Sequence, residues 1–152
     1  MAPGPRLTRA SCRCLTRRMS ERDDFLAWVG SELAGAEKAL HDGDATGWRA
    51  IWSGEEPVTI LGARKSVVGR ADLDVLLSWL EQRFSDCESF TYEVIAAEVI
   101  GDLAYTVGYE HTQATVEGDP STYSLRVTQI YRRESGRWRL VHRHGSAPPD
   151  QA

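Results

Sequence analysis

YSLRVTQIYRRESGRWRLVHRHGS, residues 123–146, is the stretch that decides the fold. Two runs rich in β-branched, aromatic and apolar residues, 124–133 and 137–144, flank the turn-forming tripeptide ESG at 134–136. Runs of this kind around a short connection that contains glycine are typical of an antiparallel β-hairpin. The stretch therefore predicts that the chain closes with two paired strands.

The pairing within this hairpin follows if residues 134–136 form a three-residue connection. One face of the hairpin then pairs, from its far end toward the turn, Arg126 with His144, Thr128 with His142, Ile130 with Leu140 and Arg132 with Trp138. This face is apolar near the turn and carries titratable groups farther along the strands. Such a gradient predicts that one face of the sheet floors both a hydrophobic core and a polar pocket.

The preceding chain predicts helices first and strands later. Apolar residues recur at three- and four-residue steps from Glu21 to Leu40, which is typical of an amphipathic helix, and Ser20 can cap it. Further helices are expected at 45–52 and 72–84, short strands at 58–61 and 67–68, and long strands at 90–100 and 103–116. This order, closed by the hairpin, predicts an α+β fold with helices packed on one face of an antiparallel sheet.

The choice of the face beneath the helices depends on the strand at 103–116. Continuing the pairing places its odd positions on the face of Arg126 and His144, and these are Leu103, Tyr105, Val107, Tyr109 and His111. Its even positions are small or polar, namely Ala104, Thr106, Gly108, Glu110, Thr112 and Ala114. Because small polar residues make a poor core, we expect the odd face to lie beneath the helices. Its polar end would then collect Tyr109, His111, Arg126, Thr128, His142 and His144 in one pocket.

Composition and charge bound the class of protein. A chain of 152 residues with 41% hydrophobic and 26% charged residues is expected to form one domain with its own core. No apolar run approaches the roughly 18 residues that cross a bilayer, so no membrane contact is expected. Five arginines and no acid lie in residues 1–18, which leaves 13 basic against 22 acidic residues in the remainder. A domain with a net charge of −9 is a poor partner for nucleic acid, whose phosphates need a basic face.

The two ends of the chain are expected to lie outside the domain. Residues 1–19 are interpreted as a disordered or spurious extension, with a targeting segment and a functional tail as alternatives. The domain itself is expected at 20–147, followed by a flexible tail at 148–152. Two of the three cysteines, Cys12 and Cys14, fall in the extension. Such a set makes no disulfide framework, so a cytoplasmic location is expected.

Three segments resemble a known superfamily. The closing run YRRESGRWRLVHRHGSAP at 131–148 resembles the end of the association domain of calcium/calmodulin-dependent protein kinase II. GDLAYTVGYE at 101–110 and LRVTQIYRR at 125–133 are similar to bacterial ketosteroid-isomerase homologues. With the order of elements, these segments make residues 20–148 similar to the SnoaL-like group of the nuclear transport factor 2-like superfamily.

The resemblance implies a cone-like α+β barrel, in which a curved antiparallel sheet wraps around N-terminal helices. It also implies a cavity at the wide end of the cone and a homodimer contact through the outer face of the sheet. The kinase domain lines its cavity with an arginine at the position of Thr128, and here Arg126 lies two residues earlier on the same face. The aspartate, tyrosine and second acid of ketosteroid isomerases find no match on the odd face, which disfavours steroid isomerisation.

The expected site combines polar groups of the odd face with a wall of tryptophans. His142, His144 and Tyr109 are the candidate catalytic residues, and Arg126, Thr128, His111, Trp48 and Trp52 are the candidate ligand-binding residues. Each also has a structural interpretation, as a hydrogen-bonded side chain near the rim or a tryptophan packed in the core. His142 and His144 lie about 6.6 Å apart along a strand and have no evident carboxylate companion, so neither a metal nor another cofactor is expected.

Three functions are compatible with these residues. The first is an isomerase, cyclase or hydratase acting on a small, partly apolar carbonyl compound, with a histidine moving the proton while Arg126 and Tyr109 hold the oxyanion. The second is a non-catalytic site for a small carboxylate that uses the same arginine and histidines. The third is a homodimeric assembly module, whose contact surface is the back of the sheet at Thr106, Glu110, Thr112, Gln129 and Tyr131. Dimerisation is compatible with either of the other two.

Overall fold

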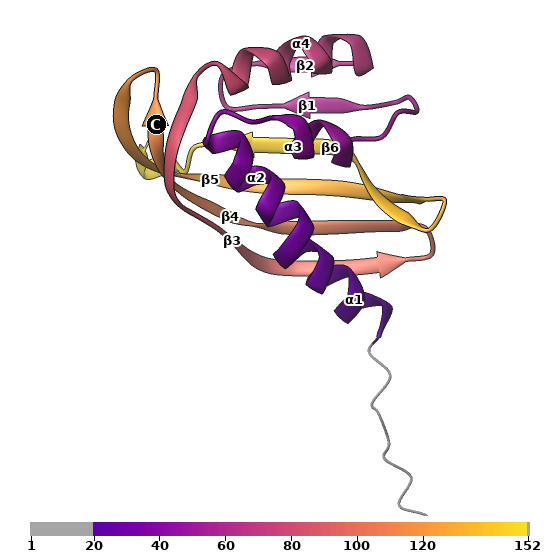
Figure 1. Cartoon of the computed structure of the whole chain (residues 1–152). Coiled ribbons are helices and arrows are strands. Elements are labelled where there is room, and N and C mark those ends of the chain that lie inside the picture. Colours follow the sequence, from indigo (N-terminus) through magenta and orange to yellow (C-terminus); the bar gives the residue numbers. More distant parts are fainter. Residues whose placement is uncertain (1–19, 152) are drawn as a thin grey trace, which may run out of the picture.

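The computed structural model describes residues 20–151 of the chain. The first layer of the molecule is helical. Helix α1 (Glu21–Trp28) starts at a reciprocal cap, in which the Ser20 hydroxyl accepts from the Asp23 amide and the Asp23 carboxylate accepts from the Ser20 amide. A π-helical turn, η1 (Val29–Leu33), joins it without a break to α2 (Ala34–His41). The long helix predicted from Glu21 is therefore confirmed (Figure 1). The predicted extension at 1–19, with Cys12 and Cys14, lies outside the described residues.

The middle of the chain alternates short helices and short strands. Its elements are α3 (Thr46–Ile51), β1 (Thr59–Leu61), β2 (Ser66–Val68) and α4 (Arg70–Glu81). Each was expected from the sequence, with boundaries that differ by one to three residues. Within residues 20–151, no helix has both the length and the apolar character needed to cross a membrane.

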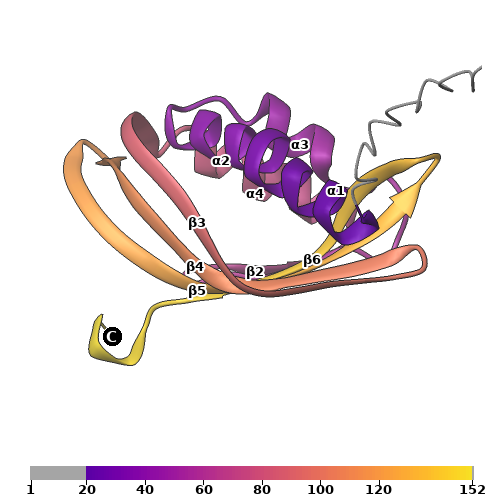
Figure 2. The ribbon, with the colours of Figure 1, turned by 90° about the horizontal axis from the view of Figure 1, so that it is seen from below.

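Four long strands complete a six-stranded sheet. They are β3 (Phe84–Ile100), β4 (Leu103–Val116), β5 (Asp119–Glu134) and β6 (Arg137–Ser146), followed by a short 3-10 turn, η2 (Pro149–Gln151). The sheet order is β2-β1-β6-β5-β4-β3, with β1 parallel to β6 and every other pair antiparallel. Figure 2 shows that the sheet is curved and unclosed, and that the helices lie in its concave side. The predicted α+β class is confirmed, with helices on one face only.

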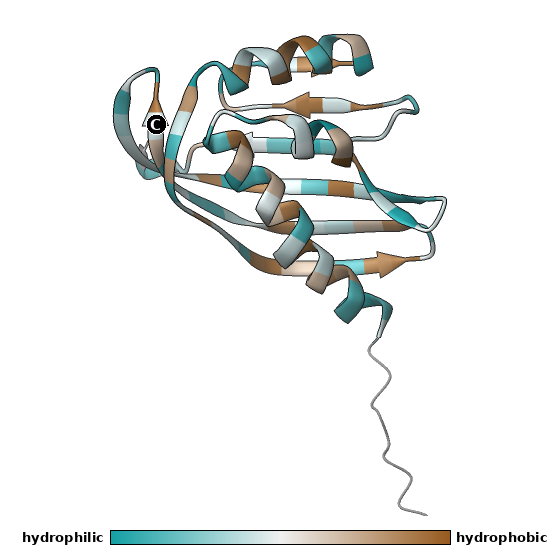
Figure 3. Ribbon diagram, in the orientation of Figure 1, coloured by the Kyte–Doolittle hydropathy of each residue, from teal (hydrophilic) through white to brown (hydrophobic). Residues whose placement is uncertain are grey.

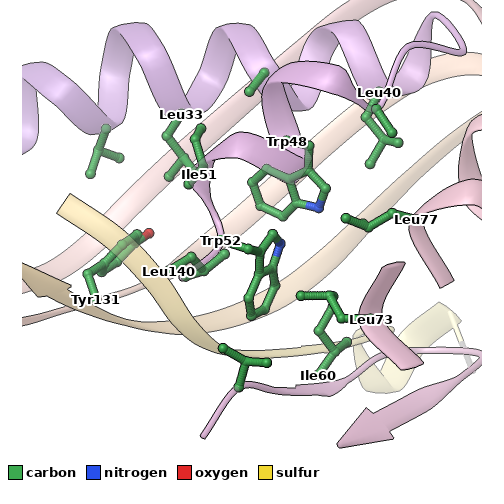
Figure 4. Close-up of a cluster of buried hydrophobic side chains, with 14 of the residues drawn as sticks. Leu33, Leu40, Trp48, Ile51, Trp52, Ile60, Leu73, Leu77, Tyr131 and Leu140 are labelled. Carbon is green, nitrogen blue, oxygen red and sulfur yellow. The ribbon is translucent and has the colours of Figure 1, made fainter. Parts of the chain in front are cut away.

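The hydrophobic core fills the space between the helices and the concave face. Aromatic rings supply much of its bulk, because Phe25, Trp48, Trp52 and Tyr131 are each at most 2% exposed. The rings of Trp48 and Trp52 meet edge to face at 6.1 Å, among leucines from α1–α2, α4 and β6 (Figure 4). Hydrophilic and hydrophobic residues interchange along the helices and strands, as Figure 3 shows.

The register of the β5–β6 hairpin differs from the prediction. The strands are joined by a two-residue turn, Ser135-Gly136, in which both residues have positive φ (49° and 75°), as two-residue hairpin turns require. Leu140 lies opposite Tyr131, whereas His142 lies opposite Ile130, so Val141 is an extra residue that forms a β-bulge. The bulge puts Leu140 on one face and His142 on the other. The apolar-to-polar gradient predicted along one face is therefore wrong.

The face beneath the helices is the even one, opposite to the prediction. Along β4 the even positions from Ala104 to Ala114 are buried, and most odd positions from Leu103 to Gln113 are exposed. The prediction failed because the large core side chains come from the helices, so the strand residues beneath them must be small. The residues assigned to the outer face for dimer contact are likewise wrong, since Thr106, Glu110, Thr112, Gln129 and Tyr131 are all buried under the helices.

Candidate functional site

Four of the residues predicted to form the site come together, but on the outer face of the sheet. Tyr109, Arg126, Thr128 and His144 line a hollow of about 370 Å³, the outer-face hollow, together with an apolar wall that includes Val107. Arg126 donates to the Ser146 hydroxyl at 3.3 Å across its edge. Their predicted position beneath the helices is wrong, because the register places this face away from the helical layer.

The remaining predicted residues divide between the two sides of the sheet. On the outer face, His111 bonds the Ser124 hydroxyl at 2.7 Å and the Glu93 carboxylate at 3.1 Å. His142 bonds the Thr59 hydroxyl at 2.7 Å, and its pKa is lowered by partial burial and by the neighbouring His144. Trp48 and Trp52, the predicted wall of the pocket, are core residues instead.

The concave side holds a charged group that the sequence reasoning missed. Arg143 of β6 makes two parallel hydrogen bonds to Glu110 of β4, at 2.5 and 2.6 Å, and a third to Glu37 of α2 at 3.3 Å. The side chains of Arg143, Glu110 and Glu37 are only 12%, 4% and 3% exposed. We call these three residues the acid–arginine cluster. A buried paired charge of this kind is costly to assemble, and such groups gather at functional sites.

Each member reaches this position through a local feature of its element. The bulge at Val141 turns Arg143 inward, and Glu110 lies on the even face of β4. Glu37 follows Leu33 by four residues and precedes Leu40 by three, so it lies on the same apolar stripe of the helix. An acid within an apolar stripe was the sequence signal that could have located the cluster.

The electrostatics of the cluster favour the protonated form of Glu37. Burial raises the pKa of Glu37 well above its usual value, the negative charge of Glu110 raises it further, and Arg143 only partly opposes them. The protonated Glu37 carboxyl is hydrogen-bonded to Glu110, which also favours the neutral form. Burial lowers the pKa of Arg143, but Glu110 and Glu37 outweigh it and raise the pKa overall, so the guanidinium stays charged.

A neutral histidine lies one helical turn beyond Glu37. His41 Nδ1 is 2.7 Å from the Glu37 carbonyl oxygen, which can only accept, so Nδ1 carries the proton. Burial lowers the pKa of His41, so its Nε2 is an unprotonated acceptor at neutral pH. The Tyr123 hydroxyl, 3.0 Å away, donates to this nitrogen. The imidazole therefore presents a base in one fixed tautomer.

An aromatic rim surrounds His41 where the cluster approaches the surface. The ring centroids of Phe84, Phe90 and Tyr123 lie 4.5, 5.6 and 6.4 Å from that of His41. All three rim residues are half-buried, whereas His41 is buried. The rim is thus the apolar border between solvent and the acid–arginine cluster.

A second polar chain runs along the concave face beside the cluster. The Tyr92 hydroxyl donates to Thr106 Oγ1 at 2.7 Å, Thr106 is 3.0 Å from the Tyr131 hydroxyl, and Tyr131 donates to Gln129 Oε1. Burial raises the pKa of both tyrosines, so they remain neutral donors. The Gln129 side-chain nitrogen is buried and has no hydrogen-bond partner within residues 20–151. This amide is a spare donor beside Arg143, which lies opposite Gln129 in the sheet.

Comparison with solved structures defines the class of fold. The chain is similar to a "putative dehydratase from the NTF2-like family" of Streptomyces avermitilis (17% identity, TM-score 0.66, 83% of this chain, 97% of that chain). It is also similar to a "putative calcium/calmodulin-dependent protein kinase type II association domain" of Thiobacillus denitrificans (19%, 0.62, 77% and 90%). A third match is a Caulobacter vibrioides protein with a cystatin-like fold (21%, 0.65, 86% and 93%).

These similarities confirm the nuclear transport factor 2-like fold. The family follows from the sequence itself, because the model of the SnoaL-like domain matches residues 29–150. The chain belongs to the SnoaL-like domain family. A search of curated proteins finds no match. The matched range contains the acid–arginine cluster, the aromatic rim and the outer-face hollow.

Proposed function

We propose that the protein binds a small, partly apolar carbonyl or carboxylate compound inside the cone and catalyses its isomerisation, cyclisation or hydration without a cofactor. One arrangement carries the proposal: the Glu37 carboxyl, whose pKa is raised by burial, lies one helical turn from the His41 imidazole, whose pKa is lowered by burial. These reactions move one proton at oxygen and another at carbon, so they need an acid and a base together. The similarity to a protein described as a putative dehydratase supports the same class of chemistry.

Each group has a role that its surroundings favour. Glu37 is the proton donor to a substrate oxygen, and Arg143 stabilises the carboxylate that remains. His41 is the base, acting through the Tyr123 hydroxyl that it holds at 3.0 Å. The apolar part of the substrate would contact the Phe84 and Phe90 rings of the rim. A ligand reaches the buried pair by displacing rim side chains, which are the partly exposed ones.

The test is hydrogen–deuterium exchange at carbon, because isomerisation, cyclisation and dehydration all begin when a proton next to a carbonyl is removed. A panel of cyclic ketones, β-hydroxy acids and unsaturated carboxylates is incubated with the protein in D₂O and followed by ¹H NMR. We expect accelerated exchange for at least one compound. Replacing His41 by Gln or Glu37 by Gln should slow that exchange by about 100-fold, the usual contribution of one positioned acid or base.

The matched control is His144→Gln, which changes an imidazole on the opposite side of the same sheet. Exchange that survives His144→Gln and is lost in His41→Gln supports the interior site. The reverse result would move the chemistry to the outer-face hollow, where His144, Tyr109 and Arg126 were predicted to act. Saturable binding without exchange, lost on Arg126→Ala, would favour a non-catalytic carboxylate site instead.

Homodimeric assembly is a second function that we propose, on a separate observation. Among residues 20–151, nine large hydrophobic residues are exposed, and all except Val75 lie on the outer face of the sheet. They include Tyr105, Val107 and Ile130, which are neighbours on adjacent strands. A group of exposed apolar side chains on one face of a sheet supports a protein interface. The similarity to a kinase association domain supports an assembly role.

The dimer is tested by light scattering after size exclusion, over a range of protein concentrations. Replacing Val107 by Glu places a charge on this face and should give a folded monomer, whose melting temperature no longer rises with protein concentration. Val75→Glu, on the exposed side of α4, is the matched control and should leave the dimer intact. A wild-type chain that is monomeric at 100 µM, well above usual homodimer constants, would overturn this assignment (roughly micromolar affinity or tighter is expected for about 800 Å² a side).

A further inference from the structure

A recess lined by arginines lies at the end of the molecule away from the aromatic rim. It has a volume of about 700 Å³, and its charged lining consists of Arg49, Arg70, Arg137, Arg139, Glu55 and Glu134. Figure 1 shows why they meet, because the end of α3, the start of α4 and the β5–β6 hairpin all lie on the same side of the molecule. We call this feature the arginine recess.

The charges of the arginine recess do not balance. Glu134 is already paired with Arg132 at 2.8 Å, so it leaves the lining arginines uncompensated. A single carboxylate, Asp74, is shared by Arg49 and Arg70 at 3.5 and 3.1 Å. With Glu55 as the remaining acid, the recess keeps a net charge of about +2. This excess is notable in a chain whose acids outnumber its bases by four overall.

Two of the arginines are anchored by hydrogen bonds to backbone carbonyl oxygens. Arg70 Nη1 donates to the carbonyl oxygens of Trp52 and Ser53, at 3.3 and 3.1 Å, and Arg139 donates to that of Ala50. Backbone carbonyls fix the direction of a guanidinium without neutralising it. Arg70 thereby uses all five of its N–H donors, because its remaining bonds go to the Arg49 carbonyl oxygen and to Asp74. Arg139 makes one bond within residues 20–151, so most of its donor capacity is available to a ligand. Preorganised cations of this kind lose little entropy when an anion binds.

Arg137 is the member without such an anchor. It is exposed at the first position of β6, where it pairs with Glu134, and within residues 20–151 its side chain makes neither a hydrogen bond nor an ion pair. Arg137 lines the same recess as three other guanidinium groups, and their like charges repel its own. An anion that bridges Arg137 to its neighbours would relieve this repulsion.

We infer that the arginine recess binds a small polyanion, with two or more negative charges carried by phosphate or carboxylate oxygens. Planar guanidinium groups match the paired oxygens of both chemistries, and several of them together favour a multiply charged ligand over acetate or chloride. The recess is independent of the interior acid and base. Tyr123 and Glu134 lie near opposite ends of β5, roughly 35 Å apart along the strand at about 3.3 Å per residue.

The experiment is titration calorimetry of the full chain with inorganic phosphate, phosphoenolpyruvate and citrate, at low and at physiological ionic strength. Acetate and glycerol serve as the singly charged and neutral probes. We expect saturable binding of at least one polyanion, with the affinity falling as salt rises. Arg137→Ala and Arg139→Ala should each weaken that binding by roughly tenfold, the effect of losing one charge-assisted contact. Phosphate compounds alone, or citrate alone, identify the source of the charge.

The control variant is Arg64→Ala, which removes an equally exposed arginine from the β1–β2 loop outside the recess. Arg64→Ala should bind the polyanion as the wild type does. Because Arg137 has no partner to lose, its replacement should leave the melting temperature unchanged, so weaker binding would not reflect unfolding. The inference is overturned if no polyanion binds at 10 mM, far above useful affinity for such sites (about 1 mM or tighter), or if all three variants bind equally well.

Discussion

The two faces of the central sheet differ in the size and polarity of their side chains. The concave face, beneath the helices, holds small residues such as Ala104 and Gly108 together with the charged Glu110. The convex face, away from the helices, holds Leu103, Tyr105 and Val107, which are larger and more apolar. A simple rule that the more apolar face of a sheet is the buried one would place the helices on the wrong face here. The comparison teaches that burial is decided by what covers a face, and here the aromatic bulk of the core belongs to the helices.

The largest expected effect concerns neighbouring residues on opposite faces. Arg143→Leu removes the cation from the acid–arginine cluster and leaves the buried Glu110 without a counter-charge. We expect this variant to lose about 3–5 kcal/mol of unfolding free energy in urea denaturation. His144→Leu, one residue along on the exposed face, should stay within about 0.5 kcal/mol of the wild type. Equal losses in both variants would contradict the assignment of the two faces.

A smaller effect is expected from hydroxyl groups on the two faces. Thr106→Val interrupts the chain from Tyr92 to Tyr131 and leaves buried hydroxyl groups with fewer partners. The expected loss is about 1–3 kcal/mol in thermal or urea unfolding. Thr128→Val, the same change on the exposed face, should be nearly neutral and could stabilise the strand slightly, because valine favours strands. A neutral Thr106→Val would show that the buried chain is not required for stability.

The smallest expected effect is a pH dependence of the folding stability, which comes from Glu37 beneath the helices. The pKa of Glu37 is raised in the folded state above its ordinary value of 4.5, so the folded state binds more protons than the unfolded state. This contribution to stability is fully present below pH 4.5 and is lost as pH rises through the folded pKa. Its slope approaches about 1.4 kcal/mol per pH unit within that window.

Glu37→Gln removes the pH-dependent contribution of Glu37 to stability while keeping the size of the side chain. Curves of unfolding free energy against pH for the two proteins, from pH 4 to pH 9, should converge or cross as pH rises, because the wild type loses stability relative to the variant. Three neighbours that face Glu37, namely Glu110, Arg143 and His41, are present in both proteins. The lowered pKa of His41 acts in the opposite sense, because its proton must be lost on folding. Parallel curves would show that Glu37 is ionised when folded.

Local signals in the sequence were sufficient for the order and type of the elements. The cap at Ser20, the apolar steps of α1–α2 and the glycine turns between the long strands each depend on residues close together in the chain. The pairing parity of β4 and β5 was also predictable, so Tyr109, Arg126 and Thr128 were grouped correctly. Features that depend on spacing within a few residues could therefore be read directly.

The candidate site could not be predicted because it depends on contacts between distant elements. Glu37, Glu110 and Arg143 come from three elements, and nothing in their local surroundings indicates that they meet. The bulge at Val141 has no glycine or proline to announce it, and it moved Leu140 to the other face from Ile130. His142 and His144 were predicted as site residues because they are titratable, whereas Arg143 between them is the residue that faces the core.

The bulge in β6 has a consequence for changes in chain length. Val141 is the surplus residue of its strand, so removing it would still leave Leu140 opposite Tyr131 and His142 opposite Ile130. A deletion at this one position would straighten the strand and preserve the composition of both surfaces. A deletion at Arg139 or Leu140 would instead pull the hairpin out of step with its two-residue turn. Natural length variation in this strand should therefore concentrate at a single site.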